Sequence, residues 1–115
     1  MNLSELKDIV EGDTIVISDE SVNLLLGFAS DLMSDALALI QEHHEETLLI
    51  TGLCNSQSIR TADMLDIKNI LIVRNKKLME EEIELAQELG LNVLSTPLTM
   101  FETCGRLYAK GIKNV

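Results

Sequence analysis

Short clusters of polar residues follow four apolar runs of this sequence, and their side chains could bind a ligand. The runs are Val22–Phe28, Thr47–Thr51, Asn69–Val73 and Asn92–Leu94, and a helix-like pattern follows each one. Ligands of α/β domains bind at the carboxyl ends of the strands. The candidate ligand-binding residues at these ends are Ser30, Asp31, Ser34, Asp35, Gly52, Asn55, Arg74, Ser95 and Thr96.

The first cluster combines hydroxyl and carboxylate groups. Asp31 and Asp35 are four residues apart, which places them on one face of a helix. Together with Ser30 and Ser34 they could hydrogen-bond a ligand or coordinate a hard cation. The alternative is that Ser30 or Asp31 caps the helix that follows, with acidic charge in its first turn.

Two adjacent histidines, His43 and His44, could also suggest a metal site. Neighbouring side chains of a helix point in different directions, and no second cluster of His or Cys supports this pair. We therefore expect a solvated helix end here and no bound metal or cofactor.

The segment after Thr47–Thr51 could bind an anion. Gly52 and Asn55 lie between a buried strand and the start of a helix, where free backbone N–H groups favour negative charge. A single glycine is a weaker signal than a glycine-rich phosphate loop. Cys54 could be a reactive thiol at the helix N-terminus or, alternatively, a small buried residue.

Hydroxyl groups and one cation complete the candidate site. We expect Thr99 to cap the last helix, which leaves Ser95 and Thr96 free to face the same cleft as Asp31. Arg74 could supply positive charge in that cleft, or it could pair with a surface Glu.

Composition narrows the class of protein. The 115 residues are 46% hydrophobic but only 3% aromatic, which predicts one domain, residues 1–115, with an aliphatic core. A net charge of −10 argues against nucleic acid as a partner. The apolar runs are too short to cross a membrane, and the first residues lack the pattern of a signal peptide. Two well-separated cysteines favour reduced thiols and a cytoplasmic location.

Strand and helix patterns alternate along the chain. The predicted helices are Leu3–Val10, Asp31–Glu42, Ser56–Leu65, Leu78–Leu89 and one that starts at Thr99; the predicted strands are the four apolar runs and Thr14–Ile17. This order predicts an α/β fold with three α/β/α layers and a mainly parallel sheet of about five strands. We expect Thr14–Ile17 at an edge or in an antiparallel pair.

Two segments are more specific than this general pattern. They are Gly27-Phe28-Ala29-Ser30-Asp31-Leu32-Met33-Ser34-Asp35-Ala36, and the stretch from Leu94 through Ser95-Thr96-Pro97-Leu98 to Tyr108. Together they resemble the DRTGG domain family, which is similar to the N-terminal domain of HPr serine kinase/phosphorylase. The resemblance covers roughly residues 3–112. The family signature falls on residues 21–27, where only Gly27 retains its identity.

The resemblance implies a regulatory role. DRTGG domains accompany nucleotide-sensing CBS domains and enzymes such as pyrophosphatases, so a nucleotide or a phosphorylated metabolite is the expected ligand and a larger metabolic enzyme the expected partner. A kinase activity is not expected, because the sequence contains no G-x-x-x-x-G-K-[ST] phosphate loop. The alternative function is a homodimeric adaptor that binds other proteins without a small ligand.

Overall fold

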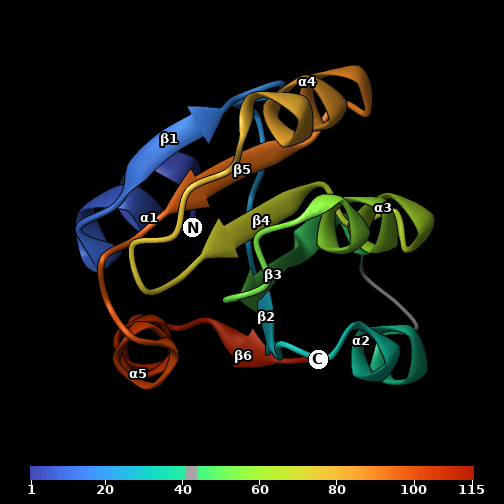
Figure 1. The fold of residues 1–115 in the computed structure, drawn as a ribbon. Coiled ribbons are helices and arrows are strands. Elements are labelled where there is room, and N and C mark those ends of the chain that lie inside the picture. The colour runs from blue at the N-terminus through green and yellow to red at the C-terminus, as the bar shows by residue number, and fades with distance from the viewer. Residues whose placement is uncertain (41–43) are drawn as a thin grey trace.

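The computed structural model describes residues 1–40 and 44–115 (Figure 1). Its helices are α1 (Leu3–Val10), α2 (Met33–Leu39), α3 (Ser56–Met64), α4 (Glu80–Glu88) and α5 (Met100–Ala109), with a 3-10 turn η1 at His44–Glu46. Its strands are β1 (Asp13–Val16), β2 (Leu26–Ala29), β3 (Thr47–Thr51), β4 (Asn69–Ile72), β5 (Asn92–Ser95) and β6 (Lys113–Asn114). The predictions for Glu42 and His43 lie outside the described residues.

The strands of the described ranges form one mixed sheet in the order β1-β5-β4-β3-β2-β6. Strands β2 to β5 are parallel, whereas β1 pairs antiparallel with β5 at one edge. The predicted α/β class, the largely parallel sheet and the edge position of Thr14–Ile17 are confirmed. Strand β6 pairs with β2 and was not predicted, because two exposed polar residues carry no strand pattern.

The sheet order decides which face each helix covers. From β2 to β5 each parallel strand is added on the same side of the one before it, so right-handed crossovers place α2, α3 and α4 on one face. Contacts between α2 and α3 and between α3 and α4 fit this arrangement, while α1 and α5 contact each other on the opposite face (Figure 1). The three-layer α/β/α architecture follows.

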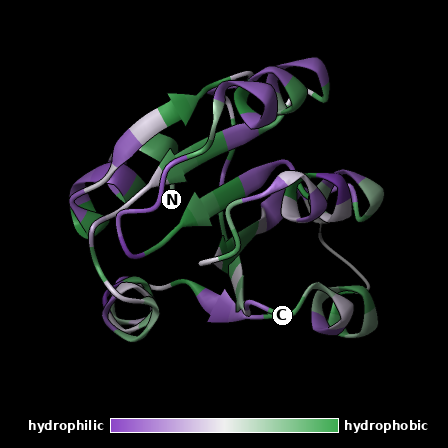
Figure 2. Cartoon of the chain, viewed as in Figure 1, coloured by the Kyte–Doolittle hydropathy of each residue, from purple (hydrophilic) through white to green (hydrophobic). Residues whose placement is uncertain are grey.

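Each face of the sheet has its own aliphatic core. Side chains of β3, such as Leu48 and Leu49, point alternately to the two faces, and every residue of this strand is buried. Figure 2 shows hydrophobic residues on much of the central sheet, hydrophilic residues at β6, and mixed residues on the helices, as expected for helices with one buried face. No helix of the described ranges is both long and apolar enough to cross a membrane.

One predicted strand begins later than its apolar run. Residues 22–25 precede β2 as an extended link, in which Leu24 donates its N–H to the carbonyl of Met1 and Leu25 donates to that of Glu46. Leu24 is buried, so its hydrophobicity reflects core packing rather than membership of the sheet. Leu24 is the one buried residue of this run, whereas Leu25 is 44% exposed, so the prediction of a buried strand over Val22–Phe28 is wrong in its start and in most of its burial.

Candidate functional site

The carboxylate of Asp31 lies against the end of strand β3. Its Oδ1 atom accepts a hydrogen bond from the N–H of Gly52 at 2.6 Å, and the hydroxyl of Thr51 lies 3.4 Å from the same oxygen. Asp31 follows β2, and β2 and β3 are adjacent parallel strands, so their carboxyl ends meet at one edge of the sheet. The predicted residues Asp31 and Gly52 are thus brought together.

Arg74 joins them from the end of β4. Its Nη2 atom lies 3.6 Å from Oδ2 of Asp31, and the side chains of Arg74 and Asp31 are 49% and 53% exposed. A Cβ atom on residue 52 would lie 2.5 Å from Nη2 of Arg74 and 3.0 Å from Oδ1 of Asp31. Only glycine leaves room for both charged groups above this backbone. Of the two alternatives for Arg74, the structure shows the charge at the strand ends, beside Asp31.

A second cation reaches the same turn. The ammonium group of Lys76 donates a hydrogen bond to the carbonyl oxygen of Gly52 at 2.7 Å. We refer to Asp31, Thr51, Gly52, Arg74 and Lys76 as the strand-end cluster. Thr51 and Lys76 were not among the predicted residues, because Thr51 belongs to the buried strand pattern and Lys76 follows β4 by several residues. The adjacent lysines at 76 and 77 were the available signal for the second cation.

The backbone that carries the two cations has an unusual conformation. Arg74 and Asn75 have φ angles of 65° and 57°, in the left-handed region that non-glycine residues seldom adopt. Their N–H groups donate to the carbonyl oxygens of Leu98 and Thr96, both at 2.8 Å. These bonds connect the turn at Arg74 and Asn75, which we call the β4 turn, to the segment after β5. They therefore hold Arg74 in place at the carboxyl ends of the strands.

Asn55 and Cys54 have local roles in the loop before α3. The Oδ1 atom of Asn55 accepts the N–H of Ser58 at 3.1 Å and so caps this helix. The thiol of Cys54 donates to the carbonyl of Lys77 at 2.8 Å, and partial burial raises its pKa, with a further contribution from the charge of Glu82. A raised pKa disfavours the reactive thiolate.

The polar residues around the start of α2 are dispersed. The hydroxyl oxygen of Ser30 accepts the N–H of Leu32 at 3.0 Å, while Ser34 and Asp35 are exposed on the helix. The residue at the N-cap is Leu32, whose apolar side chain cannot cap, so the prediction of a cap at Ser30 or Asp31 is wrong. Among the described residues, no group of three His, Cys, Asp or Glu side chains is placed to hold a metal ion.

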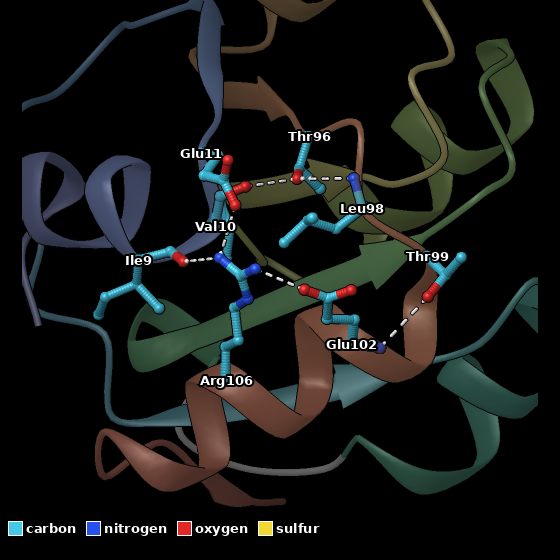
Figure 3. Close-up of polar contacts among 8 residues, drawn as sticks. All are labelled: Ile9, Val10, Glu11, Thr96, Leu98, Thr99, Glu102 and Arg106. Atoms are coloured by element: carbon cyan, nitrogen blue, oxygen red, sulfur yellow. Dashed lines mark hydrogen bonds and ion pairs between the residues drawn. The ribbon is translucent and has the colours of Figure 1, made fainter.

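Thr96 is not free to face a ligand, contrary to the prediction. Its side chain is buried, its hydroxyl donates to the carbonyl of Val10 at 2.6 Å, and it accepts the N–H of Leu98 at 3.1 Å (Figure 3). The hydroxyl therefore connects the end of α1 to the segment after β5. Ser95 is half-buried, and its carbonyl oxygen packs against Gly12, where a Cβ atom would lie only 2.7 Å away.

Arg106 connects α5 to the same end of α1. Its guanidinium donates to the carbonyl of Ile9 at 3.1 Å and to the carboxylates of Glu11 at 2.8 Å and Glu102 at 2.5 Å (Figure 3). Hydrogen bonds to Glu102 and then to Glu11 raise the pKa of Arg106. Two of these acceptors lie at the end of α1 and one on α5, so the guanidinium holds the two helices together.

The fold is similar to that of a solved regulatory region. No family model matches the chain, and no curated protein matches it. A similar structure is the crystal structure of the CBS and DRTGG domains of the regulatory region of Clostridium perfringens pyrophosphatase, complexed with its activator, diadenosine tetraphosphate. The TM-score is 0.77 at 18% sequence identity, over 92% of this chain and 45% of that chain. This chain thus spans less than half of that regulatory region, and the likeness is one of fold.

Proposed function

We propose that this chain is a non-catalytic regulatory module of the cytoplasm, a single divergent DRTGG-like domain across residues 1–115. It binds a nucleotide or another phosphorylated metabolite at the strand-end cluster and thereby regulates a metabolic enzyme. The observation that carries the proposal is the convergence of two cations, a backbone N–H and a hydroxyl on the turn at Gly52. The similar structure supports it, because that regulatory region binds a nucleotide activator.

The chemistry of the cluster suits an anion. The guanidinium of Arg74 can bind two oxygens of a phosphate at once, and the ammonium group of Lys76 provides a second positive charge. The two cations lie at the same turn of a chain whose net charge is −10. A local excess of positive charge on an acidic protein selects where an anion binds.

The proposal excludes phosphoryl transfer as the activity of this chain. A kinase positions the phosphates of ATP with a glycine-rich loop and a lysine, and the sequence contains no such loop. Signalling would instead depend on the ligand stabilising one conformation of the strand-end turns, which a partner enzyme then recognises.

Isothermal titration calorimetry with ATP, AMP, a diadenosine polyphosphate and pyrophosphate tests the binding half of the proposal. We expect at least one of them to bind and Arg74→Ala to weaken that binding by about tenfold or more. The matched control is Arg60→Ala, which removes the same charge from an exposed position of α3. Equal loss in both variants, or heat from none of the four ligands, would contradict the proposed site.

Self-association is a second candidate function. It is favoured by the exposed surface beside α5, one of the two helices that cover one face of the sheet. Beside α5 lies an apolar crevice of about 170 Å³, lined by residues that include Gly27, Ala29, Ile50, Cys104 and Tyr108. Tyr108 of this lining is 62% exposed, and Phe101, seven residues earlier on α5, is 90% exposed. Large aromatic side chains next to an apolar crevice are typical of a surface that binds another protein.

The arrangement of α5 indicates a second copy of this chain as the occupant. Phe101 and Tyr108 lie on the same side of the helix as Gly105, at which an added Cβ would meet no described heavy atom within 4 Å. Two antiparallel copies of α5 that cross near Gly105 would bring Phe101 of each copy to the crevice of the other copy.

Multi-angle light scattering over a range of concentrations tests this second function. We expect a dimer that Phe101→Ser dissociates, whereas Met64→Ser, at a similarly exposed apolar residue on α3, leaves it intact. A monomer at every concentration would refute self-association while leaving the ligand-binding proposal unaffected.

A further inference from the structure

We infer that Asp31 is an internal anion: its carboxylate occupies the place of a ligand oxygen, so that a phosphorylated ligand binds by displacing Asp31 from Gly52 and Arg74. This inference rests on the proposed function and adds two properties to it, namely the charge class of the ligand and the movement that its binding causes.

The bonds of Asp31 are those that a phosphate would make at this place. One carboxylate oxygen accepts the N–H of Gly52 at 2.6 Å and lies 3.4 Å from the hydroxyl of Thr51, while the other lies 3.6 Å from Arg74. An amide, a hydroxyl and a guanidinium are the donors with which proteins bind phosphate oxygens. The donors come from β3 and the β4 turn, whereas the acceptor comes from the segment after β2.

The contact between Asp31 and Arg74 is one that a ligand can replace. Charge-assisted hydrogen bonds between a guanidinium and an oxygen anion are about 2.7–2.9 Å long, and the observed 3.6 Å leaves Arg74 incompletely bonded to Asp31. Both side chains are about half-exposed, so solvent weakens their attraction. Lys76 bonds at this turn to the neutral carbonyl of Gly52, and an ammonium group retains further donors for an anion.

The balance of charge predicts which anions can displace Asp31. While Asp31 is bound at the turn, its single negative charge lies beside the two positive charges of Arg74 and Lys76. Once Asp31 has been displaced, the ligand interacts with both cations. An anion with a single negative charge only replaces what Asp31 already supplies. A dianionic terminal phosphate or a pyrophosphate group supplies more, and we expect it to compete where a simple carboxylate does not.

Displacement of Asp31 would alter the connection between β2 and α2. The N–H of Ser30 continues the pairing with β3 by donating to the carbonyl of Ile50, and its hydroxyl accepts the N–H of Leu32 at the start of the helix. Asp31 lies between these two anchors and is itself held by Gly52. Ligand binding would therefore release the entry to α2, which gives the site a means of signalling to a partner protein.

Calorimetry with pyrophosphate on the whole chain tests the inference. We expect Asp31→Asn, which keeps the shape but removes the competing charge, to bind pyrophosphate about tenfold more tightly than the wild type. Asp8→Asn, on the exposed surface of α1, removes one negative charge elsewhere and controls for the change in net charge. Asp31→Ala serves as a second variant, and thermal unfolding verifies that each variant is folded.

The outcomes separate the inference from the proposed function. Tighter binding by either folded variant at Asp31, without the same gain in Asp8→Asn, supports the inference. If the wild type binds and both variants at Asp31 bind equally or more weakly, Asp31 is not a competitor, while the proposed function stands. If neither the wild type nor the variants bind pyrophosphate, ATP, AMP or a diadenosine polyphosphate, the inference and the ligand-binding function are both overturned.

Discussion

The guanidinium of Arg74 lies close to the backbone of Gly52. A Cβ atom on residue 52 would come within 2.5 Å of Nη2 of Arg74. The close approach is possible only at a glycine. It brings the cation of Arg74, which follows β4, next to the N–H of Gly52, which follows β3.

Replacement of Gly52 by alanine should therefore impair ligand binding more than stability. The new methyl group displaces the end of a flexible arginine and the Asp31 carboxylate, both half-exposed, so we expect the free energy of unfolding to fall by only about 1 kcal/mol. Calorimetry should show that binding of the ligand identified with the wild type weakens by about tenfold. A variant that binds as the wild type does would show that Arg74 and Gly52 need not be in contact.

Gly105 provides the opposite case in helix α5. A Cβ at this position meets no described heavy atom within 4 Å, and alanine is the better helix former. Gly105→Ala should raise the free energy of unfolding by up to about 1 kcal/mol, as measured by urea denaturation of the monomer. If two copies pack through α5, the same variant should also weaken the dimer. A loss of monomer stability would contradict the open environment of this glycine.

The buried hydroxyl of Thr96 should matter for stability. Thr96→Val keeps the shape but leaves the carbonyl of Val10 and the N–H of Leu98 without their partner. We expect a loss of about 1–3 kcal/mol in the free energy of unfolding, measured in urea. Thr14→Val, at an exposed position of β1, is the control and should change stability little. Equal effects in the two variants would show that the bond to Val10 is not needed.

Both cysteines should react slowly in the folded protein. Burial raises the pKa of the thiols of Cys54 and Cys104, so each is protonated at a pH where a free thiol begins to ionise. Because the pKa of each thiol is higher in the folded than in the unfolded protein, the thiols' contribution to the free energy of unfolding is fully present below the ordinary thiol pKa of about 8.5. It is lost as the pH rises through the pKa of the folded protein. The rate of alkylation at pH 8 should be several times higher in urea than in buffer. Equal rates would show that burial does not protect the thiols.

The order of helices and strands could be predicted from the sequence because it depends on local patterns. Strand Thr47–Thr51 has the predicted boundaries, since a short uncharged run rich in aliphatic residues favours a strand that is buried on both faces of a sheet. The parallel arrangement also followed, because strands that alternate with helices are joined by crossovers. Leu24 shows where this reasoning ends: it is apolar and buried, yet its backbone bonds to Met1 and not to the sheet.

The α/β class, and the edge of the sheet at which polar side chains gather, could be inferred from the sequence alone. Which of these side chains meet depends on the folded chain: Asp31, Gly52 and Arg74 lie together, whereas Thr96 bonds to α1 and Asn55 caps α3. This is because hydrophobic periodicity indicates which elements form the core, while the partner of a polar group depends on strand order and on the turns between elements. Lys76 joins the cluster through such a turn, from a position where the local sequence predicts no contact with Gly52.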